Sequence, residues 1–166
     1  MYAITNERSP RNRVIRVVNF RTQWNEETII PETADVLDGV AYKQGRFILT
    51  YMRDVFHHCV VNNNRGVPLD SVSLPAKGAV SGFSGRRQDA TLLYTFSSYA
   101  HPPITYEYHP TANTSNVWNF AFVPFNSRDI QSRQVFVTSK DGTRVPMTLL
   151  RMRGKAVEGA SPTILY

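Results

Sequence analysis

"FILTY" at Phe47–Tyr51 has the composition of a β-strand, and the chain repeats it twice, as "YAITN" at Tyr2–Asn6 and as "LLYTF" at Leu92–Phe96. The threonines of the three segments lie at positions 5, 50 and 95, so the spacing is 45 residues both times. A fixed period of this kind is typical of repeat architectures, in which each repeat is one supersecondary unit. The segment therefore predicts a series of similar β-rich units.

Other β-rich runs recur around these segments at matching offsets. A second run follows each of them, at Arg13–Val18, His58–Val61 and Ile104–Tyr108, and a third run ends in proline, at Ile29–Pro31, Ser73–Pro75 and Phe122–Pro124. A further run precedes the second and third units, at Val36–Ala41 and Ala79–Ser84. Both contain a glycine, which allows close approach at a crowded centre, so we expect them to be innermost strands. Turns are expected at Asn62–Gly66 and Gly85–Asp89.

Four short strands in each repeat predict the blades of a β-propeller. Prolines and β-branched residues interrupt every candidate helix, so we predict an all-β fold with about three four-stranded blades. The first unit begins at its second strand, Tyr2, and would lack its innermost strand. Because a closed propeller needs at least four blades, the array is expected to be open, with unpaired strand edges.

The end of the chain carries a strong hairpin signal. Two β-forming runs, Val135–Thr138 and Val145–Leu150, flank Asp141 and Gly142, which tolerate positive φ. We therefore predict that residues 1–126 are propeller blades and that residues 127–166 are a linker with the first strands of another domain.

The hairpin sequence resembles a known family. Arg133–Met147, with its "SKDGTRVPM", and "SPTILY" at Ser161–Tyr166 are similar to the junction of propeller and α/β-hydrolase domain in prolyl oligopeptidase-family serine peptidases. The segments Gly82–Gly85, Tyr94–Ser98 and Pro102–Tyr106 resemble the final blade of the same proteins. The resemblance implies a two-domain cytosolic serine endopeptidase that cleaves short peptides after proline. In it, a seven-bladed propeller limits access to a Ser-Asp-His triad.

The resemblance assigns no catalytic, substrate-binding or metal-binding residue to this chain. The triad and the oxyanion-donating tyrosine of the family belong beyond the position that matches Tyr166, so we expect the chain alone to be inactive. We expect no cofactor, and as partners we expect short peptide substrates of the parent enzyme, the missing blades and the hydrolase domain. Cleavage after proline or after a basic residue stays open, because the specificity residues lie elsewhere.

A second hypothesis is a free-standing β-propeller-like module that self-associates and binds a peptide or nucleic acid. The net charge of +6 invites it, but residues 1–126 contribute only +2 and residues 127–166 contribute +4, without a run of adjacent basic residues. We therefore expect a solvated or interdomain face and no nucleic acid. No apolar run is long enough to span a bilayer, no signal peptide is apparent, and Cys59 is the single cysteine. These features predict a cytoplasmic protein without membrane contact.

Several residues resemble functional groups without the pattern that their chemistry needs. Ser84 lacks the second glycine of a nucleophile elbow, and His57 and Cys59 would share one strand face while His58 points to the other. We expect Ser84 to be a turn serine and Cys59 to lie in a blade core. Asp35 and Asp38 are expected to bind backbone amides at a turn. The glycosylation-like Asn113–Ser115 is expected in a loop. Most aromatic residues of the third unit are expected to pack between blades: Tyr94, Phe96, Tyr99, Tyr106, Tyr108, Trp118, Phe120 and Phe122.

Overall fold

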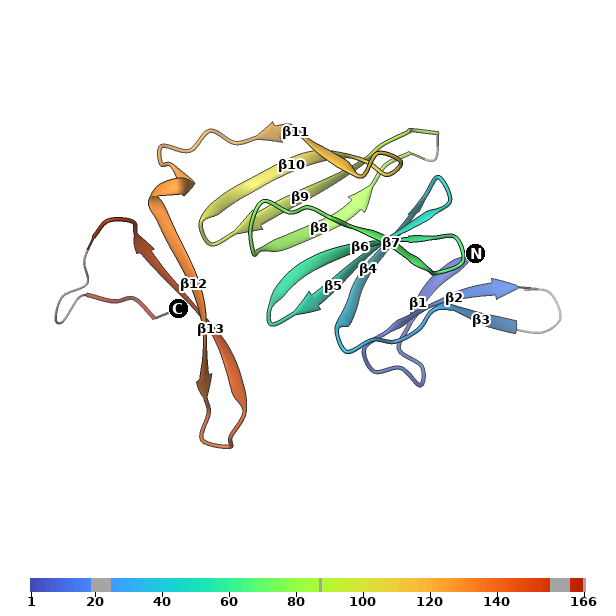
Figure 1. Ribbon diagram of the computed structural model, residues 1–166, viewed down its shortest axis with the longest axis horizontal. Helices are drawn as coiled ribbons and strands as arrows, with labels where there is room; N and C mark the ends of the chain where they lie inside the picture. The colour runs from blue at the N-terminus through green and yellow to red at the C-terminus, as the bar shows by residue number, and fades with distance from the viewer. Residues whose placement is uncertain (19–24, 87, 156–161, 166) are drawn as a thin grey trace. The chain divides into compact units, whose positions relative to one another are not determined.

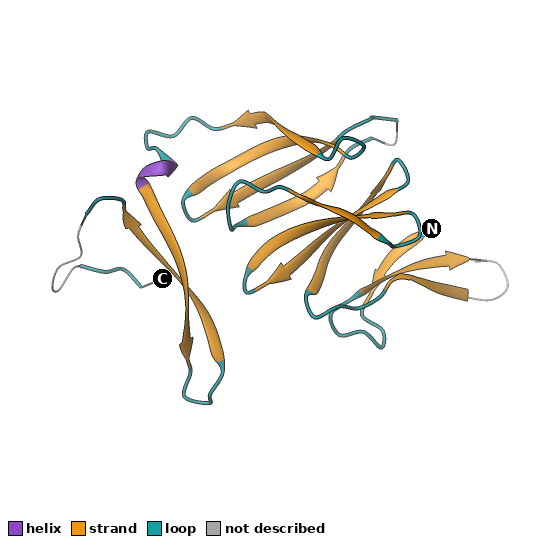
Figure 2. Cartoon of the chain, viewed as in Figure 1, coloured by secondary structure: helices purple, strands orange, loops and turns teal. Residues whose placement is uncertain are grey.

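The computed structural model describes residues 1–18, 25–86, 88–155 and 162–165. These residues form antiparallel sheets joined by turns, with one short 3-10 segment (Figures 1 and 2). The chain divides into two compact units: Met1–Ser98 with Pro102–Ala121, and Tyr99–His101 with Phe122–Tyr166. Each unit is described by itself.

The first unit contains three successive sheets, which are the predicted blades. The first blade has three strands in the order β1 (Tyr2–Thr5), β2 (Arg13–Val18) and β3 (Asn25–Ile30). The second has four: β4 (Val36–Lys43), β5 (Arg46–Arg53), β6 (Phe56–Asn63) and β7 (Pro68–Val72). The third has β8 (Ala79–Ser84), β9 (Leu92–Ser98), β10 (His101–His109) and β11 (Thr114–Phe120). The all-β blade prediction is confirmed, and the sheet of the first blade begins with the strand at Tyr2 that the repeat predicts.

Two apolar layers hold the blades together. Val14, Ile30, Leu37, Phe47, Leu49 and Tyr51 form one cluster from the first and second blades. Ile48, Cys59, Val61, Val80, Tyr94, Phe96 and Tyr108 belong to the other, from the second and third blades. Alternation explains the pattern, because successive side chains of a strand point to opposite faces. The second blade therefore packs on both of its faces, and burying apolar area there contributes about 25 cal/mol per Å².

β-Bulges recur at the same places in successive blades. In each outermost strand one residue is left over from the pairing register: Ile29 in β3, Leu69 in β7 and Trp118 in β11. In the innermost strands the register shifts at Asp38 of β4 and between Ser81 and Ser84 of β8. A bulge bends a strand and re-aims its side chains. The repeat found in the sequence therefore extends to the irregularities of the strands.

Two predicted positions need correction. The proline-ending runs Ser73–Pro75 and Phe122–Pro124 are not the outermost strands of their blades, since β7 ends at Val72 and β11 at Phe120. Proline ends such runs because it donates no ladder hydrogen bond, so the strands lie just before it. The turn predicted at Asn62–Gly66 lies between β6 and β7 as expected, whereas Gly85–Asp89 falls partly outside the described residues.

The second unit is built around the predicted hairpin. A 3-10 turn, η1 (Ser127–Asp129), leads into β12 (Ile130–Thr138), which pairs antiparallel with β13 (Arg144–Met152). Gly142 has φ +83 and donates its N–H to the carbonyl of Ser139 at 3.0 Å. Of the two residues that tolerate positive φ, only Gly142 adopts it in this loop. Asp141 instead accepts the Thr143 N–H, which lowers the pKa of its carboxyl.

Candidate functional site

The blades have two distinct ends, named here for their connections. At the linker end the chain passes from β3 to β4 and from β7 to β8, and β11 finishes there. At the far end lie the turns between β4 and β5, between β6 and β7, and between β10 and β11. Polar side chains of the second blade gather at the linker end.

The most connected polar group is the Asp35 cluster, formed by Asp35, Arg53, His58 and Tyr51. Arg53 donates from Nε to both carboxylate oxygens of Asp35 at 2.9 Å and from Nη2 to Oδ2 at 2.5 Å. The Nε2 atom of His58 lies 3.4 Å from Asp35 Oδ2, and its ring stacks on Tyr51 with centroids 5.5 Å apart. Three consecutive segments of the blade thus converge on one carboxylate.

The electrostatics of this cluster follow from those contacts. The hydrogen bonds from Arg53 lower the pKa of the Asp35 carboxyl, since they stabilise its charged form. Burial lowers the pKa of His58, although the neighbouring Asp35 charge opposes that shift. Burial also raises the pKa of Tyr51. The cluster is therefore a fixed arginine–carboxylate pair beside a neutral imidazole, which suits binding better than proton transfer near neutral pH.

His57 connects the second blade to the third. Its backbone N–H donates to the carbonyl of Gly78 at 2.9 Å, and its Nδ1 accepts the Val80 N–H at 2.8 Å. The other ring nitrogen, Nε2, is buried. That atom lies 3.3 Å from Asp38 Oδ2, close enough for an electrostatic contact although the geometry makes no hydrogen bond. The side chain is 7% exposed, so His57 is a structural connector at the start of β8.

A strained turn lies beside the Asp35 cluster. Arg53 pairs with Phe56, which leaves Asp54 and Val55 as a two-residue turn with φ +49 and +65. Both positive values identify the hairpin turn that favours asparagine or aspartate followed by glycine. For a β-branched residue this conformation is an outlier, and the left-handed region costs an L-residue about 1–2 kcal/mol. Val55 is nevertheless 57% exposed, so no packing within the described residues offsets the strain.

The far end holds neighbouring blades together by polar contacts. Thr111 donates to Gln44 Oε1 at 2.8 Å, and Asn113 donates from Nδ2 to the carbonyl of Ser71 at 3.0 Å. The amide oxygen of Asn113 accepts the Tyr108 hydroxyl at 2.8 Å. Asn113 therefore uses both ends of its amide. It lies in the turn before β11 as predicted, whereas Thr114 and Ser115, expected in the same loop, belong to β11.

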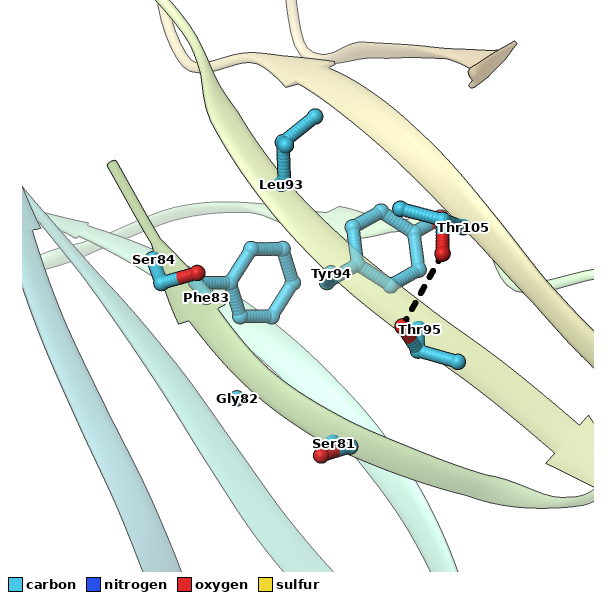
Figure 3. A pocket seen from close by; sticks show the side chains of 8 residues that line it. All are labelled: Ser81, Gly82, Phe83, Ser84, Leu93, Tyr94, Thr95 and Thr105. Atoms are coloured by element: carbon cyan, nitrogen blue, oxygen red, sulfur yellow. Dashed lines mark hydrogen bonds between the residues drawn. The ribbon is translucent and has the colours of Figure 1, made fainter. Parts of the chain in front are cut away.

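One shallow hollow of about 480 Å³ opens on the third blade beside the β8 bulge. Figure 3 shows the rings of Phe83 and Tyr94 side by side, with Thr95 and Thr105 joined by a hydrogen bond of 3.2 Å. The described residues that line it carry hydroxyls, methyls and rings but no imidazole, carboxylate or ammonium group. Without a neighbouring base, the hydroxyls of this hollow are not activated as nucleophiles.

The singled-out residues do not form a reaction centre. Ser84, expected in a turn, is instead the last residue of β8 and lines the hollow. Cys59 is 1% exposed in the core between the second and third blades, as predicted, and burial raises the pKa of its thiol to about 11. His57 and His58 point to opposite faces, as the alternation predicts. Among the described residues no three histidine, cysteine or acidic side chains could hold a metal ion.

Two expectations about polar and aromatic residues are wrong. Within the described ranges no backbone amide donates to the carboxylate of Asp35 or Asp38: Asp35 pairs with Arg53, and Asp38 contacts His57 on the other face of the blade. Of the eight aromatic residues, four pack in or against the core (Tyr94, Phe96, Tyr106 and Tyr108), whereas four are exposed (Tyr99, Trp118, Phe120 and Phe122). Two of the exposed residues lie on β11, which has only β10 as a neighbour in its sheet.

The sequence analysis did not predict the Asp35 cluster or the strained turn. A weak signal exists: Asp54 and Val55 stand between two alternating runs, where a two-residue hairpin turn favours glycine at the second place. Among the described residues, no helical segment has the length and apolar character of a membrane crossing.

Comparison with known proteins supplies the context for this geometry. Residues 1–121 match the family described as "Prolyl oligopeptidase, N-terminal beta-propeller domain". The chain is 32% identical over 169 residues to the prolyl endopeptidase of Elizabethkingia meningoseptica, covering 100% of this chain and 24% of that protein. It is 29% identical over 171 residues to prolyl oligopeptidase A of Galerina marginata, covering 99% and 23%.

Solved structures agree with the sequence comparison. A prolyl endopeptidase studied for the role of inter-domain dynamics in catalysis and specificity matches with a TM-score of 0.79 and 29% identity, over 93% of this chain and 23% of that chain. Prolyl oligopeptidase B of Galerina marginata, bound to a 25mer macrocyclization substrate, matches with a TM-score of 0.84 and 25% identity, over 96% and 23%. The chain spans about a quarter of the length of these relatives.

Proposed function

The chain belongs to the prolyl oligopeptidase family, and from this membership we propose that it supplies propeller blades to a serine endopeptidase that hydrolyses short proline-containing peptides. In this role the chain is structural: it limits access to a catalytic centre that other parts of the protein provide. It contributes no nucleophile, base or oxyanion donor.

The observation that carries the proposal is the extent of the match. The similarity to prolyl endopeptidase covers the whole chain, hairpin included, but only 24% of that protein. The blades themselves support it, because three successive antiparallel sheets pack on one another through apolar faces, as the blades of a propeller do.

Three finer points belong to the same proposal. Residues 1–126 would be the last blades of the propeller, and residues 127–166 the linker and first strands of the peptidase domain. The basic residues of the hairpin would form a solvated or interdomain face. The parent enzyme would work in the cytoplasm on peptides, without nucleic acid or membrane as a partner.

The experiment is to measure the natural gene product by intact-mass spectrometry and to assay it on a fluorogenic proline-containing peptide. A polypeptide several times heavier than 18.9 kDa that hydrolyses the peptide supports the proposal. A matched peptide with alanine in place of proline controls for other peptidases and should be cleaved poorly. A natural product of 18.9 kDa, especially as a closed oligomer, would contradict it and favour a self-associating binding module.

A further inference from the structure

We propose that β11, the outermost strand of the third blade, is the surface by which two copies of this protein associate, edge to edge and antiparallel. The four-stranded sheets of the two copies would then join into one sheet of eight strands. The inference goes beyond the proposed function, because it concerns association between copies and does not depend on the reaction that the protein performs.

Exposed apolar side chains on a free strand edge are the first observation. Val117, Trp118 and Phe120 are 56%, 62% and 64% exposed. Within the described part of the chain, β11 pairs on one side only, with β10 (Figure 1). A free edge presents unpaired backbone N–H and C=O groups, and apolar side chains along it favour pairing with another strand. β11 therefore offers both main-chain and side-chain contacts to a second strand.

The outermost strands of the other two blades are protected against such pairing. β3 carries Glu26 and Glu27, which form ion pairs with arginines of β2. β7 has five residues, begins with Pro68 and carries Asp70. Charges, proline and short length all discourage edge-to-edge pairing. β11 has seven residues with neither a charge nor a proline, and the bulge does not distinguish it, because all three outermost strands share one.

The composition around β11 points to a second copy as its partner. In a two-fold antiparallel pair a strand faces itself in reverse, so a charge near its centre would meet a like charge. Residues 110–127 contain no acidic, basic or histidine residue. β11 can consequently pair with itself without the electrostatic repulsion that the two glutamates of β3 would cause.

The strand is already ordered for this contact. Asn113, directly before it, donates to the carbonyl of Ser71 in the second blade at 3.0 Å. Ser115 accepts the Tyr94 hydroxyl at 3.1 Å. These bonds and the ladder with β10 hold the strand in place, so little conformational freedom is lost on association.

Sedimentation velocity of the intact protein over a wide range of concentrations tests the association. The wild type should show a monomer–dimer equilibrium. Trp118→Lys places like charges near the two-fold axis and should raise the dissociation constant about a hundredfold. Leu69→Lys is the matched control, because Leu69 is the out-of-register residue of β7 and is 49% exposed. The same lysine on that protected strand should leave the dimer unchanged.

A charge-reversal pair keeps the test independent of the folding of one variant. Trp118→Glu alone should also be monomeric, but its mixture with Trp118→Lys should dimerise, because opposite charges then face each other. A wild type that stays monomeric at every concentration would overturn the β11 contact. So would a dimer that survives Trp118→Lys, an equal loss in Leu69→Lys, or a mixture that stays monomeric.

Peptide hydrolysis by the same samples keeps this result separate from the proposed function. Hydrolysis by a wild type that never dimerises overturns the β11 contact alone. A dimer that is lost in Trp118→Lys and restored in the mixture, without hydrolysis of the proline-containing peptide, supports the contact and contradicts the proposed function.

Discussion

The second blade has a two-residue turn of the same backbone geometry at each end, but the two turns differ in the residue at their second position. At the far end, Gln44–Gly45 is relaxed, and the neighbouring turns lie against adjoining blades through Thr111 and Asn113. At the linker end, Asp54–Val55 is strained and exposed beside an ordered arginine–carboxylate pair. The far end joins blades through turn residues, whereas the linker end combines the His57 connection to the third blade with a strained, exposed turn. The difference teaches that both ends of the second blade contact neighbouring blades, while the strained valine turn lies at the linker end.

Close packing at the far end should make it intolerant of added volume. A Cβ on Gly66, which has φ +82, would lie 2.0 Å from the carbonyl oxygen of Ile29 in the first blade. Gly66→Ala must therefore move backbone against backbone and should destabilise the blades by about 3 kcal/mol. Urea unfolding measures the loss, with Gly45→Ala as the control, since its Cβ meets nothing within 4 Å. A loss at Gly66 no larger than at Gly45 would show that the far end is loosely packed.

At the linker end, substitution of His57 should lower the stability more than substitution of the exposed residues. His57→Ala leaves the Val80 N–H without its acceptor in a buried position and opens a small cavity, at a cost of about 2–3 kcal/mol. His58→Ala, on the other face of the same strand, should cost clearly less. Thermal unfolding of the two variants compares them directly. Equal losses would contradict the assignment of His57 as the connector between blades.

The side-chain amide of Asn113 at the far end should have a smaller effect on stability than Gly66 or His57. Asn113→Asp keeps the shape of the side chain and its tolerance of φ +52 but removes the donor to the Ser71 carbonyl. We expect a loss of about 1 kcal/mol, typical of one exchanged hydrogen bond. Chemical denaturation monitored by tryptophan fluorescence gives the value. Asn116→Asp, a nearby change on β11 for which no hydrogen bond to another blade is described, serves as the matched control and should be close to neutral.

The smallest effect is expected at Asp35 and should depend on pH. Because the pKa of Asp35 is lowered in the folded state, its carboxylate stabilises the fold above the ordinary range near pH 4, and this contribution is lost as the pH falls through the folded-state pKa. The melting temperature of Asp35→Asn should lie about 2 °C below wild type at pH 7. The two should converge as the pH falls from about 4 through the folded-state pKa of Asp35. A difference that does not change with pH would mean that the carboxylate charge is irrelevant.

The architecture was predictable from the sequence because it is periodic. The site was not predictable, because its residues follow no repeat. Segments such as Phe47–Tyr51 and Leu92–Phe96 repeat at a fixed distance, and alternation alone places His57 and His58 on opposite faces. The Asp35 cluster depends on Asp35, Arg53 and His58, which meet only once three segments are placed side by side. No local pattern encodes that meeting, so the roles expected for the two aspartates were wrong. The outermost strands were placed too late because proline follows the strand instead of belonging to it.

The recurring bulges have a consequence for the design of new propellers. One residue stands out of register in each outermost strand, at Ile29, Leu69 and Trp118, and each innermost strand with a partner is interrupted near its glycine. Sliding such a strand by one residue would misplace both interruptions together with every inward side chain. The register of a blade is thus fixed at both its innermost and its outermost strand. The module from the start of β4 (Val36) through the linker before β8 (Ala79) is consequently a natural unit for tandem repetition in designed propellers of chosen blade number.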